Sequence, residues 1–308
     1  MSKQGGLAGG IDRGQMAASP GEIPARGWWD IGRRTISRSR KNGILLVAAG
    51  VTFYGLLAIV PALAAFMTFY GLFFDPGEIE RHIGKVSNFV PERLLAIVRD
   101  QLERVTTHER GALGVAFLSS TVISMWSALA AVRAIIRALN IAYEEEEKRS
   151  FLRLNGLALM FTVGAMVYCS IVLAGVAFAP VVLDAIGLGP LTSALARIAR
   201  WPILLALVLV VVAVLYRYAP SRSRPMWRWI TWGSGAAVIG WFVFSLIFSW
   251  YVSSIRNYDE THGSLGAIVV FMIWMWLSTA IILLGAELNA EIERQTMRDT
   301  NADRAGDI

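Results

Sequence analysis

This 308-residue chain contains two pairs of like-charged residues, one pair at the end of each of two long apolar stretches. Within each pair the two residues are four positions apart. Arg133 and Arg137 follow one stretch, and Glu287 and Glu291 follow another. Residues i and i+4 share one helix face, so each pair presents its charges to one side. Charged groups next to lipid are costly unless they are paired. The spacing therefore makes a charge pairing between two helix ends geometrically possible. Such a pairing would lock a helix bundle or form the polar floor of a cavity, with locking as the first interpretation.

Another apolar stretch carries a proline and two polar residues that could also serve a function. Pro61 removes a backbone hydrogen bond and can kink a helix, and Thr52 and Tyr54 precede it by about two turns. A kink at this position can open a cavity or adjust helix packing. Both interpretations stay open.

The chain lacks the residue patterns of common catalytic and metal sites. It has no HExxH, GxSxG or P-loop motif, and its single cysteine, Cys169, lies in an apolar stretch. His82, His108 and His262 do not have the spacing of a compact metal motif. The acidic run Glu144 to Glu147 is expected to be a solvated loop. The sequence therefore predicts no catalytic residue, no metal site and no cofactor.

The composition is that of a membrane protein. Hydrophobic residues make up 55% of the chain and the mean hydropathy is +0.52. Only 17% of the residues are charged, against about 25% in ordinary globular domains. The net charge of +6 comes from positive residues that lie between apolar stretches and form no basic face. No nucleic-acid partner is therefore expected.

Six uncharged stretches approach or exceed the length needed to cross a hydrocarbon core. Because strand edges in lipid would leave backbone amides unpaired, such stretches predict helices. The fold class is therefore an all-α membrane protein with six transmembrane helices. The predicted spans are Asn42 to Phe74, Gly111 to Val132, Leu154 to Leu183, Trp201 to Tyr216, Trp229 to Ile255 and Ser264 to Ala286.

The charges between the spans predict their orientation. The segments on the side of both termini hold 20 Lys and Arg residues, against 9 on the other side. By the positive-inside rule, both termini are expected in the cytoplasm. Residues 1–27 are expected to be a disordered cytoplasmic tail, 28–292 the transmembrane domain and 293–308 a second tail.

Two amphipathic segments flank the first predicted span. From Trp28, hydrophobic residues alternate with Arg33, Arg34, Arg38 and Arg40, which is typical of a helix on the inner leaflet near anionic headgroups, or of a topology signal alone. Asp75 to Arg110 predicts two amphipathic helices on the outer side. These could cap the helix ends, cover a cavity or rest on the outer leaflet.

Three segments together resemble the YihY/virulence factor BrkB family of bacterial inner-membrane proteins. They are AAGVTFYGLLAIVPAL (Ala48 to Leu63), SALAAVRAIIRALNIAY (Ser127 to Tyr143) and HGSLGAIVVFMIWMWLSTAIILLGAELNAE (His262 to Glu291). The resemblance implies six helices with both termini in the cytoplasm. His262 stands where the family pattern usually has a tyrosine. By position, the family's motif residues fall on Thr52, Tyr54, Pro61, Asn140, Tyr143, Gly263, Gly266, Gly285, Glu287 and Asn289.

These features predict a non-enzymatic transporter or a lipid- or envelope-handling protein of the bacterial inner membrane. Membrane lipids, anionic ones among them, are the expected partners, with a second copy or other inner-membrane proteins as further candidates. The alternative function is a membrane scaffold or assembly factor. A membrane-attached ribonuclease ranks lowest, because phosphodiester hydrolysis usually needs positioned carboxylates or histidines on a metal.

Overall fold

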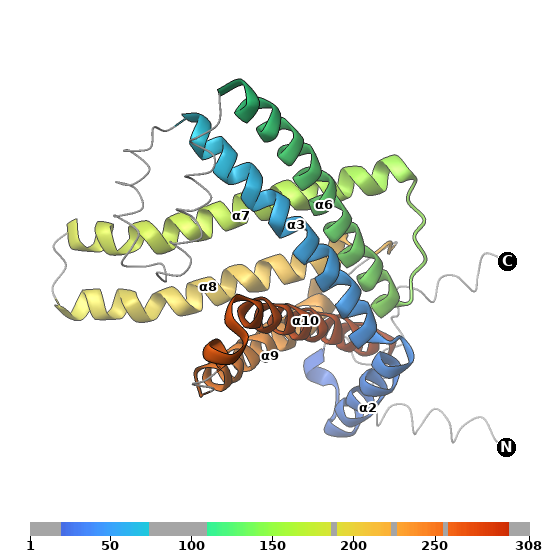
Figure 1. Ribbon diagram of the computed structural model, residues 1–308. Helices are drawn as coiled ribbons and strands as arrows, with labels where there is room; N and C mark the ends of the chain where they lie inside the picture. Colours follow the sequence, from blue (N-terminus) through green and yellow to red (C-terminus); the bar gives the residue numbers. More distant parts are fainter. Residues whose placement is uncertain (1–19, 74–109, 186–189, 223–226, 255–257, 296–308) are drawn as a thin grey trace, which may run out of the picture. The chain divides into compact units, whose positions relative to one another are not determined.

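The computed structural model describes residues 20–73, 110–185, 190–222, 227–254 and 258–295, and these residues are helical apart from short connections. The elements are the 3-10 turn η1 (Pro20–Glu22) and the helices α2 (Ala25–Lys41), α3 (Ile44–Phe73), α6 (Arg110–Tyr143), α7 (Phe151–Ala185), α8 (Pro190–Tyr218), α9 (Trp227–Ser254) and α10 (Tyr258–Gln295) (Figure 1). The described residues contain no strand, and the predicted all-α class is confirmed.

Five of the described helices are long and apolar enough to cross a membrane. A sixth span results if α2 and the first part of α3, which meet at a bend of 61°, are counted together. The predicted fourth span, marginal at Trp201 to Tyr216, lies inside the longer helix α8. The amphipathic outer segment predicted for Asp75 to Arg110 lies, except for its last residue, outside the described residues.

The chain divides into two compact units. The first comprises the residues up to Thr52 and from Val132 onward, and the second comprises Phe53–Ala131. In the second unit the Tyr54 side chain is exposed, and its ring lies edge-on to Phe53 with centroids 5.6 Å apart. The remaining description concerns the first unit.

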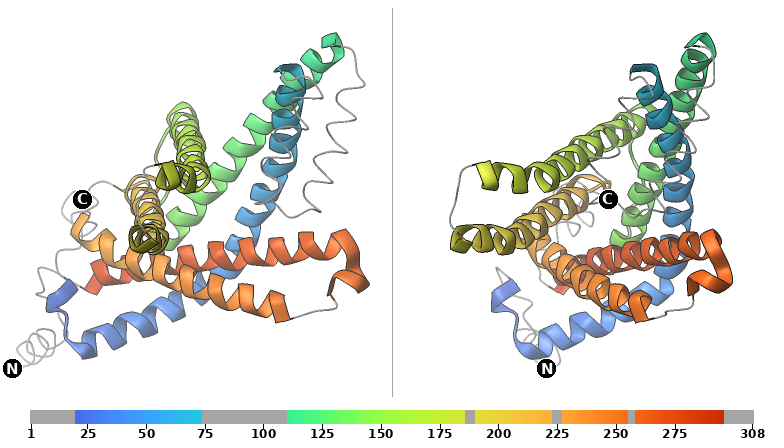
Figure 2. Two further views of the ribbon diagram at one scale, coloured as in Figure 1. Left: turned by 90° about the vertical axis from the view of Figure 1, so that its left-hand side faces the viewer. Right: turned by 60° about the vertical axis from the view of Figure 1, so that its left-hand side comes forward.

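Helix α10 is the centre of the first unit. It lies along α9 and also contacts α2 near its C-terminal end (Figure 2). The predicted sixth span ended at Ala286, but the helix continues for more than two further turns to Gln295. These added turns carry charged residues, so α10 joins an apolar segment to a polar one.

The helix ends next to α10 have identifiable stop signals. After α2, Asn42 is the C-cap and Gly43 adopts a φ of +61°, a left-handed conformation that glycine adopts without strain. After α6, Glu144 adopts a φ of +54°. The Glu145 amide there donates to the Asn140 carbonyl, as in a Schellman motif. Each of these helix ends places a polar side chain, Asn42 or Glu144, next to the C-terminal turns of α10.

The described helices extend into both predicted tails. Within the predicted tail 1–27, residues 20–22 form η1, Ile23 is buried, and α2 begins at Ala25. Within the predicted tail 293–308, α10 continues to Gln295. The rest of both tails lies outside the described residues.

Candidate functional site: a buried carboxylate cluster and an apolar crevice

The last turns of α10 carry polar side chains that are buried. Glu287 and Asn289 are 0% exposed, and Glu291 is 1% exposed. Their positions divide them between two helix faces: Glu287 and Glu291 share one face, while Asn289 shares the other with Glu293. We call the group on the first face, with the residues that contact it, the carboxylate cluster.

Two arginines of α2 meet Glu291. Arg34 Nε lies 2.7 Å from one carboxylate oxygen of Glu291, and Arg38 Nε lies 2.7 Å from the other. Arg294, one turn further along α10, donates to Glu291 at 2.9 Å. Three guanidinium groups therefore surround a single buried carboxylate and hold α2 against α10.

Glu287 has a different environment from Glu291. Its Oε1 accepts a hydrogen bond from Asn42 Nδ2 at 2.6 Å, while its Oε2 is buried with no hydrogen-bond partner among the described residues. Asn42 is the C-cap of α2 and precedes the bend at Gly43. Glu287 thus contacts the joint between α2 and α3.

Glu144 completes the cluster from the end of α6. Its carboxylate forms ion pairs with Arg38 and, at 3.1 Å, with Arg294. Burial alone would raise the pKa of Glu144, but the hydrogen bond from Arg38 and the charges of Arg294, Arg38 and Lys41 outweigh burial and hold the pKa below its usual range. The acidic run Glu144 to Glu147 was predicted to be a solvated loop. That prediction is wrong for Glu145, which is buried, whereas Glu144 is exposed and in addition pairs with the arginines of α2 and α10.

The opposite face of α10 binds the ends of α6 and α8. Asn289 Nδ2 donates to the Tyr143 hydroxyl at 3.1 Å and to Glu293 Oε1 at 3.3 Å. Glu293 forms an ion pair with Arg222 at 2.8 Å, in which both side chains are almost fully buried. The Arg222 guanidinium lies 4.1 Å from the centroid of the Tyr143 ring, a cation–π contact. This face is a second polar network, stabilised by a buried ion pair.

Asn140 connects the α6–α7 loop to the end of α8. Its Oδ1 accepts from the Ser221 amide at 2.8 Å, and its Nδ2 donates to Glu147 at 3.0 Å. The Arg149 guanidinium donates to the carbonyls of Tyr218, Ala219 and Pro220, which lie at the end of α8 where helical partners are lacking. Together these side chains satisfy backbone groups at the end of α8.

Glycines allow α9 and α10 to approach closely. A Cβ atom at Gly285 would come within 2.5 Å of Ala237 Cβ, 2.7 Å of the Tyr216 hydroxyl and 3.0 Å of the Gly233 carbonyl oxygen. The Tyr216 hydroxyl, in a fully buried side chain, donates to the Ile282 carbonyl. Small residues at such a contact are typical of packed membrane helices.

The structure brings together five of the predicted site residues. Asn140, Tyr143, Gly285, Glu287 and Asn289 all lie at the joined ends of α6, α8 and α10. The two predicted carboxylates, Glu287 and Glu291, are buried as a functional or locking role requires.

The predicted partners of those carboxylates were wrong. Arg133 donates to Asn155 of α7 at 2.7 Å, and the Arg137 side chain is exposed. Among the described residues, the ion pairs of Glu291 are with Arg34, Arg38 and Arg294. The four-residue spacing of Arg133 and Arg137 places both on one face of α6. It does not determine which neighbouring helix that face contacts.

The other predicted positions lie apart from the cluster or in less fully described surroundings. The Thr52 hydroxyl is buried and donates to its own helix at the Ala48 carbonyl. Gly266 is buried in α10. Tyr54 belongs to the second unit. Pro61 lies within α3 and Gly263 within α10, but their surroundings are outside the described part of the structure.

Several residues of the site were not predicted as such. Arg34 and Arg38 were assigned to an inner-leaflet helix, while Asn42, Arg222 and Glu293 were not singled out. The i, i+4 spacing of Arg34 and Arg38 matches that of Glu287 and Glu291, and this second arginine pair was the available signal. For Arg222 and Glu293, we find no sequence signal that sets them apart from other charged residues.

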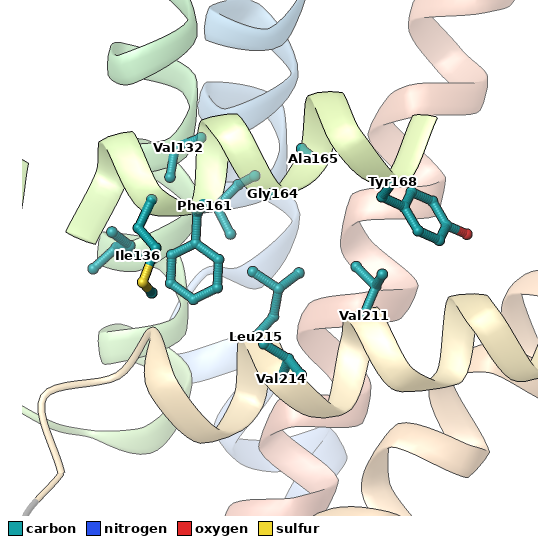
Figure 3. A pocket seen from close by; sticks show the side chains of 11 residues that line it. Val132, Ile136, Phe161, Gly164, Ala165, Tyr168, Val211, Val214 and Leu215 are labelled. Atoms are coloured by element: carbon teal, nitrogen blue, oxygen red, sulfur yellow. The ribbon is translucent and has the colours of Figure 1, made fainter. Parts of the chain in front are cut away.

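An apolar crevice lies between α6, α7 and α8. Its volume is about 380 Å³, within the range of ligand pockets. Figure 3 shows Phe161 of α7 pointing into the space between α7 and α8 beside Leu215, while Val211 of α8 lies further along, below Tyr168. Gly164 and Ala165 leave the α7 wall open at its centre. A crevice with such a lining suits a hydrocarbon chain and offers little to a polar solute.

A second, smaller cavity lies next to this crevice. Its volume is about 70 Å³, and it shares Ile135 and Leu215 with the crevice. Its lining also includes Ile282, whose carbonyl accepts from Tyr216. The apolar space therefore extends to the edge of the polar networks.

The ion pairs of the carboxylate cluster hold α2 and the end of α6 against α10. Arg34, Arg38 and Arg294 form ion pairs with Glu144 and Glu291, while Glu287 is hydrogen-bonded to Asn42. Among the described residues, no group of three or more His, Cys, Asp or Glu side chains is arranged to hold a metal ion.

Comparison with known proteins gives a consistent set of relatives. The model of the family described as Virulence factor BrkB matches residues 35–307. A putative ribonuclease-like protein of Bacillus subtilis, YfkH, is 31% identical over 261 residues, which cover 82% of this chain and 92% of that protein. A UPF0761 membrane protein of Alkalilimnicola ehrlichii is 28% identical over 268 residues, covering 81% of this chain and 55% of the relative. One of Pseudoalteromonas translucida is 23% identical and covers 89% of this chain and 88% of the relative.

The lengths of these relatives differ. The chain spans nearly all of YfkH but only about half of the Alkalilimnicola ehrlichii protein. No solved structure matches the chain.

Proposed function

Because this chain belongs to the virulence factor BrkB family and is a multi-pass membrane protein, we propose that it is a non-enzymatic lipid-handling protein of the bacterial inner membrane. In this proposal the crevice between α6, α7 and α8 takes up one hydrocarbon chain of a membrane amphiphile. Both termini face the cytoplasm, in agreement with the distribution of Lys and Arg. The carboxylate cluster keeps the helix ends together while the crevice is filled and emptied.

The crevice is the observation that carries this proposal. It lies between three helices that are each long and apolar enough to cross a membrane. Apart from Tyr168 its walls are apolar side chains, so a charged or sugar-like solute would lose its hydration and gain few hydrogen bonds. An acyl chain has no such cost. The smaller cavity next to Leu215 supports the same interpretation, because most of its lining is apolar too.

A lipid-movement assay on purified protein in liposomes tests this proposal. The crevice can be filled by Gly164→Leu, because a Cβ atom at Gly164 would meet nothing within 4 Å. Gly156→Leu is the matched control, because Gly156 lies on the same helix, is equally open, and does not line the crevice. We expect wild-type protein and Gly156→Leu to move a fluorescent phospholipid between leaflets, and Gly164→Leu to lose most of that activity.

Two results would contradict the proposal. Liposomes with wild-type protein could move no lipid faster than empty liposomes, or Gly164→Leu could remain as active as Gly156→Leu. Circular dichroism and the elution volume of each purified variant establish that a loss of activity is not a loss of fold.

The name of the Bacillus subtilis relative suggests RNA cleavage as an alternative. Hydrolysis of a phosphodiester would usually need carboxylates that are available to bind a metal. In the described residues, Glu291 is surrounded by three arginines and Glu293 is paired with Arg222, which favours the non-enzymatic proposal. Metal-dependent RNA cleavage by the pure protein that is abolished by Glu287→Gln would reverse this ranking.

A further inference from the structure

Helix α2 presents arginines on two different faces. Arg34 and Arg38 point to the carboxylate cluster and are paired there. Arg33 and Arg40 are exposed instead, and Ile36 lies between them on the same stripe of the helix, at i+3 and i+7 spacing. The outer face of α2 is therefore basic and apolar, whereas its inner face is committed to ion pairs.

An apolar groove begins at this outer face. It has a volume of about 300 Å³ and lies between α2, α9 and α10. Gly32 and Ile36 border it on α2, Ala237 on α9, and Ile281 and Leu288 on α10. The groove is separate from the crevice between α6, α7 and α8, with which it shares no residue.

The walls of the groove cannot bind a polar molecule well. On the α2 side of the groove the lining includes the Thr35 hydroxyl. That hydroxyl already donates a hydrogen bond to the Ile31 carbonyl at 2.9 Å. Gly285 and Ala237, where α10 and α9 pack closely, also line the groove. Its interior therefore suits hydrocarbon, while the arginines beside Ile36 supply positive charge at its edge.

We propose that this groove binds an anionic phospholipid, with the upper part of one acyl chain against α9 and α10 and the phosphate between Arg33 and Arg40. Arginine matches phosphate oxygens with paired N–H donors. The two arginines lie about 10 Å apart along the helix axis, so both side chains can bend toward one headgroup beside Ile36. This site does not require lipid movement across the bilayer, and it goes beyond the function proposed for the crevice.

Charge complementarity is the reason to assign a lipid to the groove. Lys41, whose charge also acts on Glu144, is a further exposed positive residue at the end of α2. Basic residues close to an anionic membrane surface contribute about 1 kcal/mol each. Trp29 lies on the same exposed stripe, four residues before Arg33, and tryptophan is enriched at the membrane interface. These features place a lipid headgroup at α2 and its hydrocarbon in the groove.

Native mass spectrometry of the purified full-length protein tests the site. The probes are phosphatidylglycerol and phosphatidylcholine with identical acyl chains, which differ in headgroup charge alone. We expect wild-type protein to bind phosphatidylglycerol more tightly. The double variant Arg33→Gln/Arg40→Gln should lose about fivefold in affinity for phosphatidylglycerol for each arginine removed and little for phosphatidylcholine.

The matched control for charge is Lys148→Gln/Arg153→Gln. It removes the same charge from exposed positions near the start of α7, away from the groove lining. For the groove itself, Gly32→Leu should weaken the binding of both lipids, because a Cβ atom at Gly32 meets nothing within 4 Å and the added side chain can enter the groove. Gly50→Leu, at an equally open glycine of α3, is the control for that change.

Three outcomes would overturn the proposal. Wild-type protein could bind the two lipids equally, or the charge control could lose as much affinity as Arg33→Gln/Arg40→Gln. The protein could also form a dimer that Gly32→Leu dissociates, in which case a second copy occupies the groove. A failure here leaves the crevice proposal standing, because that proposal is tested by Gly164→Leu.

Discussion

The two parts of α10 differ in the kind of side chain that they expose and bury. In the apolar part, Ile268 and Phe271 are 57% and 42% exposed. In the C-terminal turns, Glu287 and Glu291 are buried and contact other helices through polar atoms. A single helix thus exposes hydrocarbon along one segment and encloses carboxylates along the next.

This inversion follows from the surroundings of each segment. Apolar side chains can face outward where the neighbour is lipid, because lipid tails are as apolar as the side chains themselves. Carboxylates can be buried only where partners replace their hydration. Helix α2 and the end of α6 provide those partners through Arg34, Arg38 and the residues around Tyr143. The position of α2 therefore determines where α10 changes character.

The largest expected effect comes from breaking the buried ion pair on the polar part of α10. Glu293→Ala leaves the Arg222 guanidinium buried without its carboxylate, which should cost about 3–5 kcal/mol of unfolding free energy. Denaturation of the purified protein in detergent measures this cost. The double variant Arg222→Met/Glu293→Leu should recover most of the lost stability. A loss of less than 1 kcal/mol for Glu293→Ala would mean that the pair is not buried.

A charge on the lipid-facing surface should have the next largest effect. Val243 is exposed near the middle of the span Trp232–Ser254, and Val243→Lys should cost about 2.5–3.5 kcal/mol of membrane insertion. An insertion assay in microsomes measures this. Leu152→Lys is the control, because Leu152 is exposed near the start of α7, where a lysine can reach the headgroups. Equal insertion of both variants would contradict a lipid-facing position for Val243.

The contact between α9 and α10 should tolerate no added methyl group at Gly285. Gly285→Ala brings a Cβ atom within 2.5 Å of Ala237, and overpacking of this kind costs about 1–3 kcal/mol. Thermal unfolding of the purified variant gives the value. Gly240→Ala on α9 is the control, because its Cβ would lie at an ordinary 3.5 Å from Ile281. If both variants unfold at the same temperature, the close approach of the two helices is not real.

The smallest effect is expected at Glu144, on the partly exposed edge of the cluster. Because its pKa is lowered in the folded protein, its ion pairs stabilise the fold above the ordinary glutamate pKa of about 4.3 and lose that effect as the pH falls through the folded value. Glu144→Gln should therefore be slightly less stable than wild type at pH 7, by about 0.2–1 kcal/mol for an exposed pair.

Acidification and a glycine variant separate the two roles of Glu144. The difference in melting temperature between Glu144→Gln and wild type should shrink at pH 3. Glu144→Gly should be more stable than Glu144→Gln by about 1–2 kcal/mol, because glycine removes the strain of a positive φ. A constant difference at all pH values would show that the carboxylate is not paired in solution.

The sequence predicted the apolar framework well because lipid imposes strong constraints on it. Long uncharged stretches such as Ser264 to Ala286 must form helices in a membrane, and the described helices contain nearly all of the predicted spans. The end of α10 was harder to predict. The rule that located the span stopped at Glu287, the first charge, whereas the helix continues because α2 covers that charge.

The partners in the site could be predicted only in part. Asn140, Tyr143 and Asn289 were identified as related by the family resemblance, and they meet at the joined helix ends. The cations for Glu291 were assigned to the wrong helix, because helical spacing fixes a face but gives no information about its neighbour. The bend at Gly43, which turns α2 toward α10, depends on one left-handed residue in a short Asn-Gly connection.

The ion pair between Arg34 and Glu291 also has a consequence for biosynthesis. The two residues are 257 positions apart, so at about 5–20 residues per second the ribosome needs roughly 13–50 s to supply the carboxylate after the arginine. Until then the arginine face of α2 has no partner on α10, and a nascent chain cannot close the cluster. Closure of the cluster therefore requires that translation has passed Glu291, so α2 waits for its partner through the synthesis of every helix between them.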